Sequence, residues 1–132
     1  MESHPYELFR RGTELLAADH AHQAATVLER AHRLLPGKGS VSEALGRAYY
    51  RCGRPADART QFAEVVENDP ANDYAHFGLA LCLARIGERT LAAGHLRLAL
   101  AMRPGVAAYQ EALARVTGDR PPPAPAGPDR RG

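Results

Sequence analysis

The stretch LGRAYYRCGRPADARTQFAEVVENDP, residues 45–70, decides the fold because it reads as two helices joined by one tight turn. Leu45 and Tyr49 fall on one face of the first helix, at the spacing expected of an amphipathic helix. Gly53 is placed to end that helix. Pro55 suits the first turn of the next helix, where its missing N–H group costs nothing.

The second helix of this stretch carries its own apolar face, formed by Ala58, Phe62 and Val65. It is expected to end before Pro70, because proline disfavours the α conformation of the residue in front of it. Upstream of residue 45, Ser40 and Glu43 have the spacing of a capping box, which predicts the start of the first helix. The unit is therefore helix, turn, helix.

This unit recurs with a period of 34 residues, and several columns of residues repeat together. Because many columns agree, chance does not explain the period, and the chain is expected to be a repeat protein. The repeating columns are Pro36, Pro70 and Pro104; Ala24, Ala58 and Ala92; Leu28, Phe62 and Leu96; Leu15, Tyr49 and Leu83; and Gly12, Gly46 and Ala80.

The small columns predict where the two helices of one unit approach each other. Gly46 and Ala58 are expected to form that close contact, with Tyr49 and Phe62 filling the space beside it. A leucine at either small position should unfold the stack, because overpacking strains a close helix contact. One hairpin cannot bury both of its faces, so neighbouring hairpins must stack.

The period resembles the tetratricopeptide repeat, whose pattern reads W-x2-L-G-x2-Y, then A-x3-F, then P. The second repeat matches it at Leu45, Gly46, Tyr49, Ala58, Phe62 and Pro70. Leu8, Ser42 and His76 stand where the family prefers tryptophan. The resemblance implies an all-α, right-handed superhelical solenoid of three such repeats followed by a C-terminal capping helix.

The expected domain covers residues 1–117, with repeats near 5–38, 39–72 and 73–106 and a capping helix near 106–117. An alternative for the last helix is a truncated fourth repeat that pairs with another chain. Residues 118–132 are rich in proline and are expected to be a disordered tail. Within that tail, residues 122–125 fit a PxxP pattern. The expected helices span 5–18, 22–35, 40–52, 56–68, 73–86, 90–102 and 106–117.

No motif for catalysis, metal binding or cofactor binding stands out, so no enzyme, metal or cofactor is expected. His20 and His22 lie two residues apart, whereas helical metal ligands need three or four. His76 and His95 read as isolated residues. Cys52 and Cys82 have apolar neighbours and are expected to be buried free thiols.

Bulk composition points to an ordinary globular protein, with 45% hydrophobic and 24% charged residues and a net charge of +2. No secretory signal or membrane span is apparent, so a soluble cytoplasmic location is expected. Lys38 is the only lysine, and the richness in Arg, Ala, Gly and Pro suggests a GC-rich bacterial genome. The mild basicity does not favour nucleic-acid binding.

The resemblance implies that the first helix of each repeat lines a concave groove, in which many members of the family bind a peptide or a helix. Five of the eight aromatic residues lie on the faces of these helices turned away from their packing positions. Any one of these aromatics could instead seal a joint between repeats. The predicted groove residues are Tyr6, Phe9, Thr13, Arg47, Tyr50, Arg51, Tyr74, Phe77, Leu81 and Arg85.

Aromatic side chains beside arginines favour a partner segment with apolar and acidic groups, since arginine grips carboxylates in a bidentate manner. The lysine–asparagine carboxylate clamp of some family members is not expected here. The sequence thus predicts an adaptor or scaffold that binds another protein. Two alternatives remain open: a self-assembling structural protein that oligomerises through its terminal repeats, and an accessory or regulatory subunit of an enzyme complex.

Overall fold

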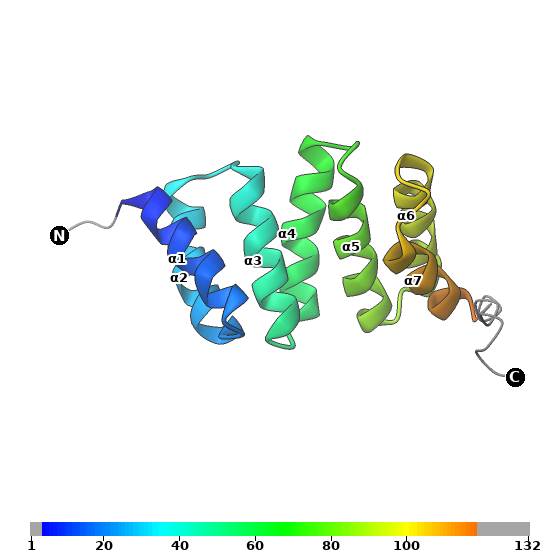
Figure 1. Ribbon diagram of the computed structural model, residues 1–132, viewed down its shortest axis with the longest axis horizontal. Coiled ribbons are helices and arrows are strands. Elements are labelled where there is room, and N and C mark those ends of the chain that lie inside the picture. The colour runs from blue at the N-terminus through cyan, green and yellow to red at the C-terminus, as the bar shows by residue number, and fades with distance from the viewer. Residues whose placement is uncertain (1–3, 119–132) are drawn as a thin grey trace, which may run out of the picture.

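The computed structural model describes residues 4–118, which form seven α-helices and no strands. The helices are α1 (Pro5–Ala17), α2 (Ala21–Leu34), α3 (Gly39–Arg51), α4 (Pro55–Asn68), α5 (Asp73–Ile86), α6 (Arg89–Met102) and α7 (Ala107–Thr117). They follow one another along the long axis of the molecule, so that neighbours in sequence are neighbours in space (Figure 1). The predicted all-α solenoid is confirmed.

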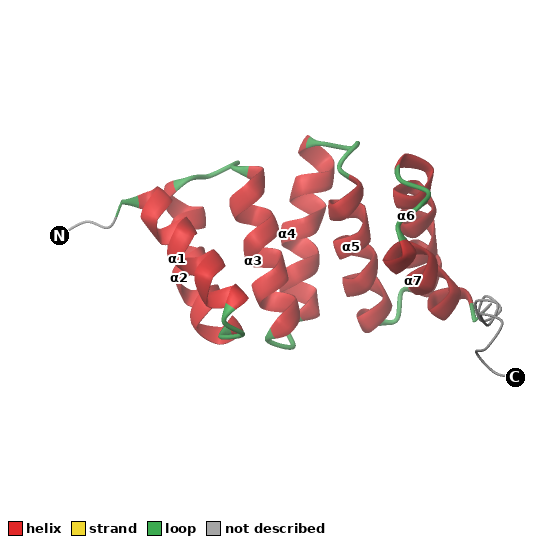
Figure 2. Ribbon diagram, viewed as in Figure 1, coloured by secondary structure: helices red, strands yellow, loops and turns green. Residues whose placement is uncertain are grey.

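Short turns join the helices, as Figure 2 shows. Gly53 follows the C-cap residue Cys52 of α3 and takes a left-handed conformation with φ +80°, as its predicted role in ending that helix requires. Pro55 is the first residue of α4, and α4 ends at Asn68. None of the helices in the described residues is both long and apolar enough to cross a membrane. The predicted tail lies almost entirely outside the described residues.

The predicted capping box at Ser40 and Glu43 is wrong. Helix α3 begins at Gly39, and its N-cap residue Lys38 makes no side-chain cap. The Lys38 carbonyl accepts hydrogen bonds from the amides of Val41 and Ser42, each at 3.1 Å. The first turn therefore closes earlier than the side-chain pattern suggested, and Ser40 lies inside it.

The close helix contacts centre on glycine, but their partners differ from the prediction. A Cβ on Gly46 would lie 2.9 Å from Phe62 Cε2, so the Phe62 ring, not Ala58, is its nearest neighbour. A Cβ on Gly78 would lie 2.5 Å from Cε1 of the same ring. Phe62 is thus held between α3 and α5. In the first hairpin, a Cβ on Gly12 would likewise clash with the Leu28 side chain.

One apolar core runs through the stack from Leu16 in α1 to Ala112 in α7. A smaller cluster of Leu8, Ala31 and Val41 joins α1, α2 and α3. Helix α7 packs on α6 and α5, which places it over the end of the stack. The core thus extends through all the hairpins. It also fixes the position of α3 relative to α5, the two helices that form one face of the stack.

Candidate functional site

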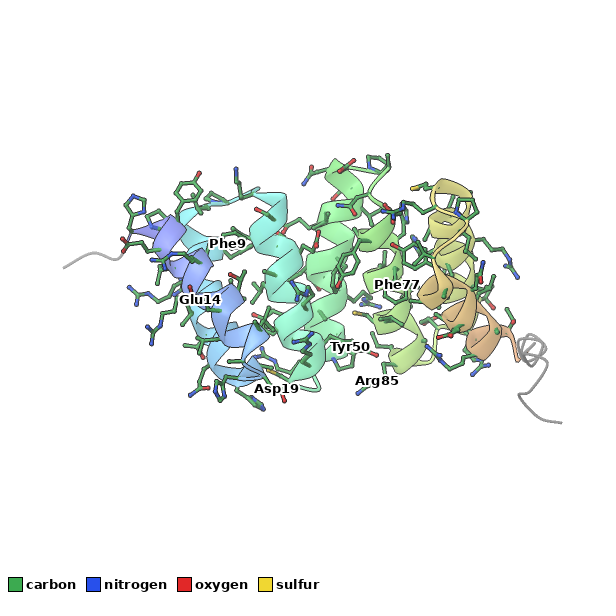
Figure 3. All side chains as sticks on the ribbon, in the orientation of Figure 1. Phe9, Glu14, Asp19, Tyr50, Phe77 and Arg85 are labelled. Carbon is green, nitrogen blue, oxygen red and sulfur yellow. The ribbon has the colours of Figure 1, made fainter. Side chains whose placement is uncertain are left out.

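A hollow of about 230 Å³ lies between α3 and α5. Six of the ten residues predicted for the groove line it, and Figure 3 labels Tyr50 and Phe77 among them. The sequence placed these six on one surface because they belong to the first helices of two successive repeats. The lining residues are Arg47, Tyr50, Arg51, Phe62, Tyr74, Phe77, Gly78 and Leu81.

Phe62 contributes to this hollow although it belongs to α4, the second helix of its hairpin. It reaches the groove because Gly46 and Gly78 have no side chains to block its ring. From the sequence, Phe62 was predicted to lie in the core, and Gly78 was not among the predicted groove residues. The sequence nevertheless contains a signal that places Gly78 in the groove. Gly78 lies one turn after Tyr74 and three residues before Leu81, and both of these are predicted groove residues.

The aromatic rings form a connected series from α4 to α7. The Phe62 and Tyr74 rings meet edge to face with centroids 6.5 Å apart. The centroid distance is 6.1 Å from Tyr74 to Phe77 and 4.9 Å from Phe77 to Tyr109. Such pairs stabilise each other beyond the area they bury. The hollow therefore has aromatic walls whose rings support one another.

Charged groups beside Tyr74 shape the electrostatics of the hollow. Burial raises the pKa of Tyr74, while the nearby charges of Arg47 and Arg51 lower it and that of Glu43 raises it. Burial also raises the pKa of Glu43, opposed by Arg47 and by a hydrogen bond with Asn72. Arg47, which lines the hollow, is half-buried next to the Glu43 carboxyl group.

Arg51 has a structural contact that the sequence did not reveal. Its Nη1 donates to the carbonyl oxygen of Leu16 at 3.0 Å, so it ties the end of α1 to α3. This is possible because α1 ends beside the last turn of α3, an adjacency that exists only in the stack. Arg51 thus lines the hollow and also joins two hairpins.

A second hollow, also about 230 Å³, adjoins the first because both are lined by Tyr50 and Leu81. The Arg85 guanidinium lies over the Tyr50 ring, 4.9 Å from its centroid, and the two residues lie near each other in Figure 3. The other lining residues are Ala84, Arg89, Ala112, Arg115 and Val116. No aspartate or glutamate lines either hollow.

Arg89 and Arg115 were not among the predicted groove residues, since they lie on α6 and α7 and not on the first helix of any of the three repeats. Arg89 Nη2 donates to the carbonyl oxygens of Arg115 at 3.2 Å and of Val116 at 2.5 Å. It thereby satisfies carbonyls at the C-terminus of α7, which lack partners within the helix. Helix α7 therefore extends the basic surface.

Three predicted groove residues on α1 line neither hollow. Phe9 packs against both core clusters and seals the joint between α1 and its neighbours. Thr13 Oγ1 donates to the carbonyl oxygen of Arg10 at 2.9 Å, within its own helix. Tyr6 is exposed at the end of the stack, with Lys38 Nζ 5.9 Å from its ring centroid.

The histidines at 76 and 95, predicted to be isolated, form a stacked pair. Their Nδ1 atoms are 3.0 Å apart, and the rings stack with centroids 5.2 Å apart. His76 Nε2 lies 2.8 Å from the carbonyl oxygen of Pro70 and must donate there, because a carbonyl only accepts. The pair links α5 to α6 in the place where the family prefers tryptophan.

Neither cysteine forms a disulfide, as predicted. Cys82 is buried, and burial raises the pKa of its thiol to about 12. Cys52 is only half-buried, so the prediction of full burial was wrong for it. Among the described residues, no three His, Cys, Asp or Glu side chains gather as a metal site would require.

Comparisons with solved structures find the same fold at low sequence identity. The first tetratricopeptide domain of Spaghetti (RPAP3), bound to the HSP90 peptide SRMEEVD, aligns with a TM-score of 0.81 and 13% identity, covering 86% of this chain and 90% of that one. The Sgt2 domain from Aspergillus fumigatus aligns with a TM-score of 0.79 and 16% identity, covering 96% and 93%.

MamA residues 41 to the end, from Desulfovibrio magneticus RS-1, align with a TM-score of 0.83 and 20% identity, covering 88% of this chain and 67% of that one. No curated protein matches the sequence. Two family models, each described as tetratricopeptide repeat, match residues 15–70 and 43–107, which together span most of the chain. The chain therefore belongs to the tetratricopeptide-repeat family.

Proposed function

We propose that this chain is a protein-interaction module that binds an extended or helical segment of a partner protein on the face formed by α3, α5 and α7. One observation carries the proposal: two adjoining hollows are walled by aromatic rings and five arginines, with no carboxylate among their lining residues. The membership of the chain in the tetratricopeptide-repeat family supports it.

The chemistry of the two hollows defines the partner segment. An apolar side chain fits between Phe62, Tyr74 and Phe77, where aromatic walls exclude water. Carboxylates suit the guanidinium groups that surround this place, because arginine forms bidentate, charge-assisted hydrogen bonds with them. We infer a segment that combines a leucine or aromatic residue with acidic residues. Acting through shape and charge, such a module needs no cofactor.

The test is selection from a random peptide library displayed on phage, followed by fluorescence anisotropy with the selected peptides. Enriched peptides should combine an apolar residue with aspartate or glutamate. Arg47→Glu together with Arg85→Glu should weaken their binding at least tenfold, since each change replaces attraction by repulsion. Arg51 is left intact, because it holds the end of α1.

The matched control is Arg30→Glu with Arg33→Glu, which changes the net charge equally on exposed positions of α2 outside both hollows. This control should bind like the original chain. Equal binding by the groove variant, or a library without any acidic–apolar consensus, contradicts the proposal. Circular dichroism of each variant checks that the helices are intact.

A further inference from the structure

The outward face of α6 carries an apolar stripe along the helix. Leu91, Leu98 and Met102 are 54%, 47% and 36% exposed. They lie seven and four residues apart, which places them in one stripe along the helix. Exposed Gly94 and Ala101 lie beside this stripe, and no acidic residue occurs anywhere in α6. Single exposed leucines are ordinary, whereas a continuous apolar stripe marks an interaction surface.

The repeat itself does not require this stripe. The positions one period earlier on α4, equivalent to Leu91, Leu98 and Met102, are Asp57, Glu64 and Asn68. In the preceding hairpin, Asp57 pairs with Arg54 and Glu64 accepts a hydrogen bond from Ser42, so the equivalent face is polar although the fold is the same. The apolar face is therefore a property of α6 and not of the family pattern.

A hollow of about 470 Å³ lies beside the stripe, between α4 and α6, and its lining includes Leu79, Leu83, Leu91 and His95. One period earlier, the position of Leu83 is held by Tyr49. The Tyr49 hydroxyl donates to Glu29 at 2.6 Å, and Arg54 lies over its ring at 4.4 Å. That network is absent from the later repeat, because leucine has no ring or hydroxyl.

The spacing along the α6 face is self-complementary. Leu91, His95, Leu98 and Met102 follow one another at intervals of four, three and four residues. This order reads the same in both directions. If a second α6 lies antiparallel, Leu91 meets Met102 of the partner subunit and His95 meets Leu98 of the partner subunit, with each contact made twice. Such reciprocity defines an interface around a two-fold axis.

Two of the three arginine and glutamate residues that line the hollow fit the same arrangement. Arg59 lies near the start of α4 and Glu67 near its end, and both line the hollow. An antiparallel second copy reverses α4, which brings Arg59 toward Glu67 of the partner subunit on both sides of the axis. Opposite charges then face each other, whereas a parallel arrangement would oppose like charges.

We propose that two copies of this chain dock through the outer faces of α6, antiparallel across a two-fold axis, with Leu98 of each entering the hollow beside His95 of the other. Gly94 and Ala101 let the helices approach closely, because they carry little or no side chain. This surface lies on a different side of α5 from the arginine-lined hollows. The docking therefore leaves the proposed peptide-binding face available.

Sedimentation equilibrium of the full chain over a wide concentration range is the first test. The expected result is a reversible monomer–dimer equilibrium. Leu98→Glu should shift it toward monomer and raise the dissociation constant of the dimer at least tenfold. Leu34→Glu is the matched control, since Leu34 is 51% exposed on α2 and lies two periods before Met102. It should dimerise like the original chain. A monomer at every concentration, or a dimer unaffected by Leu98→Glu, overturns the proposal.

Disulfide trapping tests the orientation in a Cys52→Ala background. An equimolar mixture of Leu91→Cys and Met102→Cys chains should form mixed dimers upon oxidation, while each chain alone should remain largely uncoupled. Coupling within each single variant indicates parallel helices and overturns the antiparallel assignment. Independently, Arg59→Glu and Glu67→Arg should each weaken dimerisation, and the two changes combined should restore it.

Discussion

At the scale of the residue, the contact of Phe62 with two glycines tightly constrains the stack. A Cβ on Gly78 would lie 2.5 to 2.7 Å from three atoms of the Phe62 ring. We expect Gly78→Ala to lower the free energy of unfolding by roughly 1–3 kcal/mol, because the overpacked ring must move and displace its neighbours. Urea denaturation measures the change.

The control for this substitution is Gly39→Ala. Gly39 is also helical, but a Cβ there would meet nothing within 4 Å. Alanine should leave the free energy of unfolding unchanged or raise it slightly, since it favours helix more than glycine does. If both variants were equally stable, the close approach of Phe62 to α5 would not be a constraint.

The stacked histidines predict a dependence of stability on pH. Burial lowers the pKa of His95, and the neighbouring His76 lowers it further. The unfolded chain therefore binds more protons than the folded chain once the pH falls below the ordinary value of 6.5. The free energy of unfolding should decrease as the pH falls from that value through the lowered pKa of the folded state.

Thermal melts between pH 8 and pH 5 measure this effect. His95→Gln should show a smaller loss of melting temperature on acidification, because glutamine does not titrate. His22→Gln is the control, since His22 is exposed on α2. Equal acid sensitivity of the original chain and His95→Gln would contradict this prediction.

At the scale of the element, α7 is held to the stack by its first turn. The Tyr109 hydroxyl donates to Asp73 Oδ2 at 2.5 Å, and the ring is 5% exposed. Burial and this carboxylate raise the pKa of Tyr109. The charged hydrogen bond connects α7 to the first residue of α5, so it fixes the wall of the second hollow.

We expect Tyr109→Phe to lower the free energy of unfolding by about 1.5–3 kcal/mol, because the substitution removes a hydrogen bond to a charged group. Hydrogen exchange should accelerate mainly in α7. Tyr6→Phe serves as the control, because Tyr6 is half-exposed at the opposite end. Unchanged exchange in α7 would show that ring packing alone holds the helix.

At the scale of the whole molecule, stability should decline from the centre of the stack toward its ends. Helices α3, α4 and α5 have packed neighbours on both sides, whereas α1 and α7 lie at the ends (Figure 1). Because each hairpin contacts only its neighbours, the ends can open without the centre. Native-state hydrogen exchange should be slowest in α3 to α5. Uniform protection of all seven helices would instead indicate one cooperative unit.

The sequence determined the architecture because local signals and the 34-residue period agree. Gly53 and Pro55 set one turn, and the helix ends observed differ from those expected by at most one residue. The period also placed residues such as Arg47 and Tyr74 on the first helices of adjacent hairpins, where they line one hollow. These properties depend on neighbours near in sequence or one repeat away.

Only the tertiary structure decided which side chains meet across the stack. It brought Phe62 to the groove between two glycines, tied Arg51 to the end of α1 and joined His76 to His95. It also left a hollow beside Leu83 where Tyr49 fills the equivalent space. These outcomes depend on side-chain volume and direction between helices, which periodicity alone does not specify.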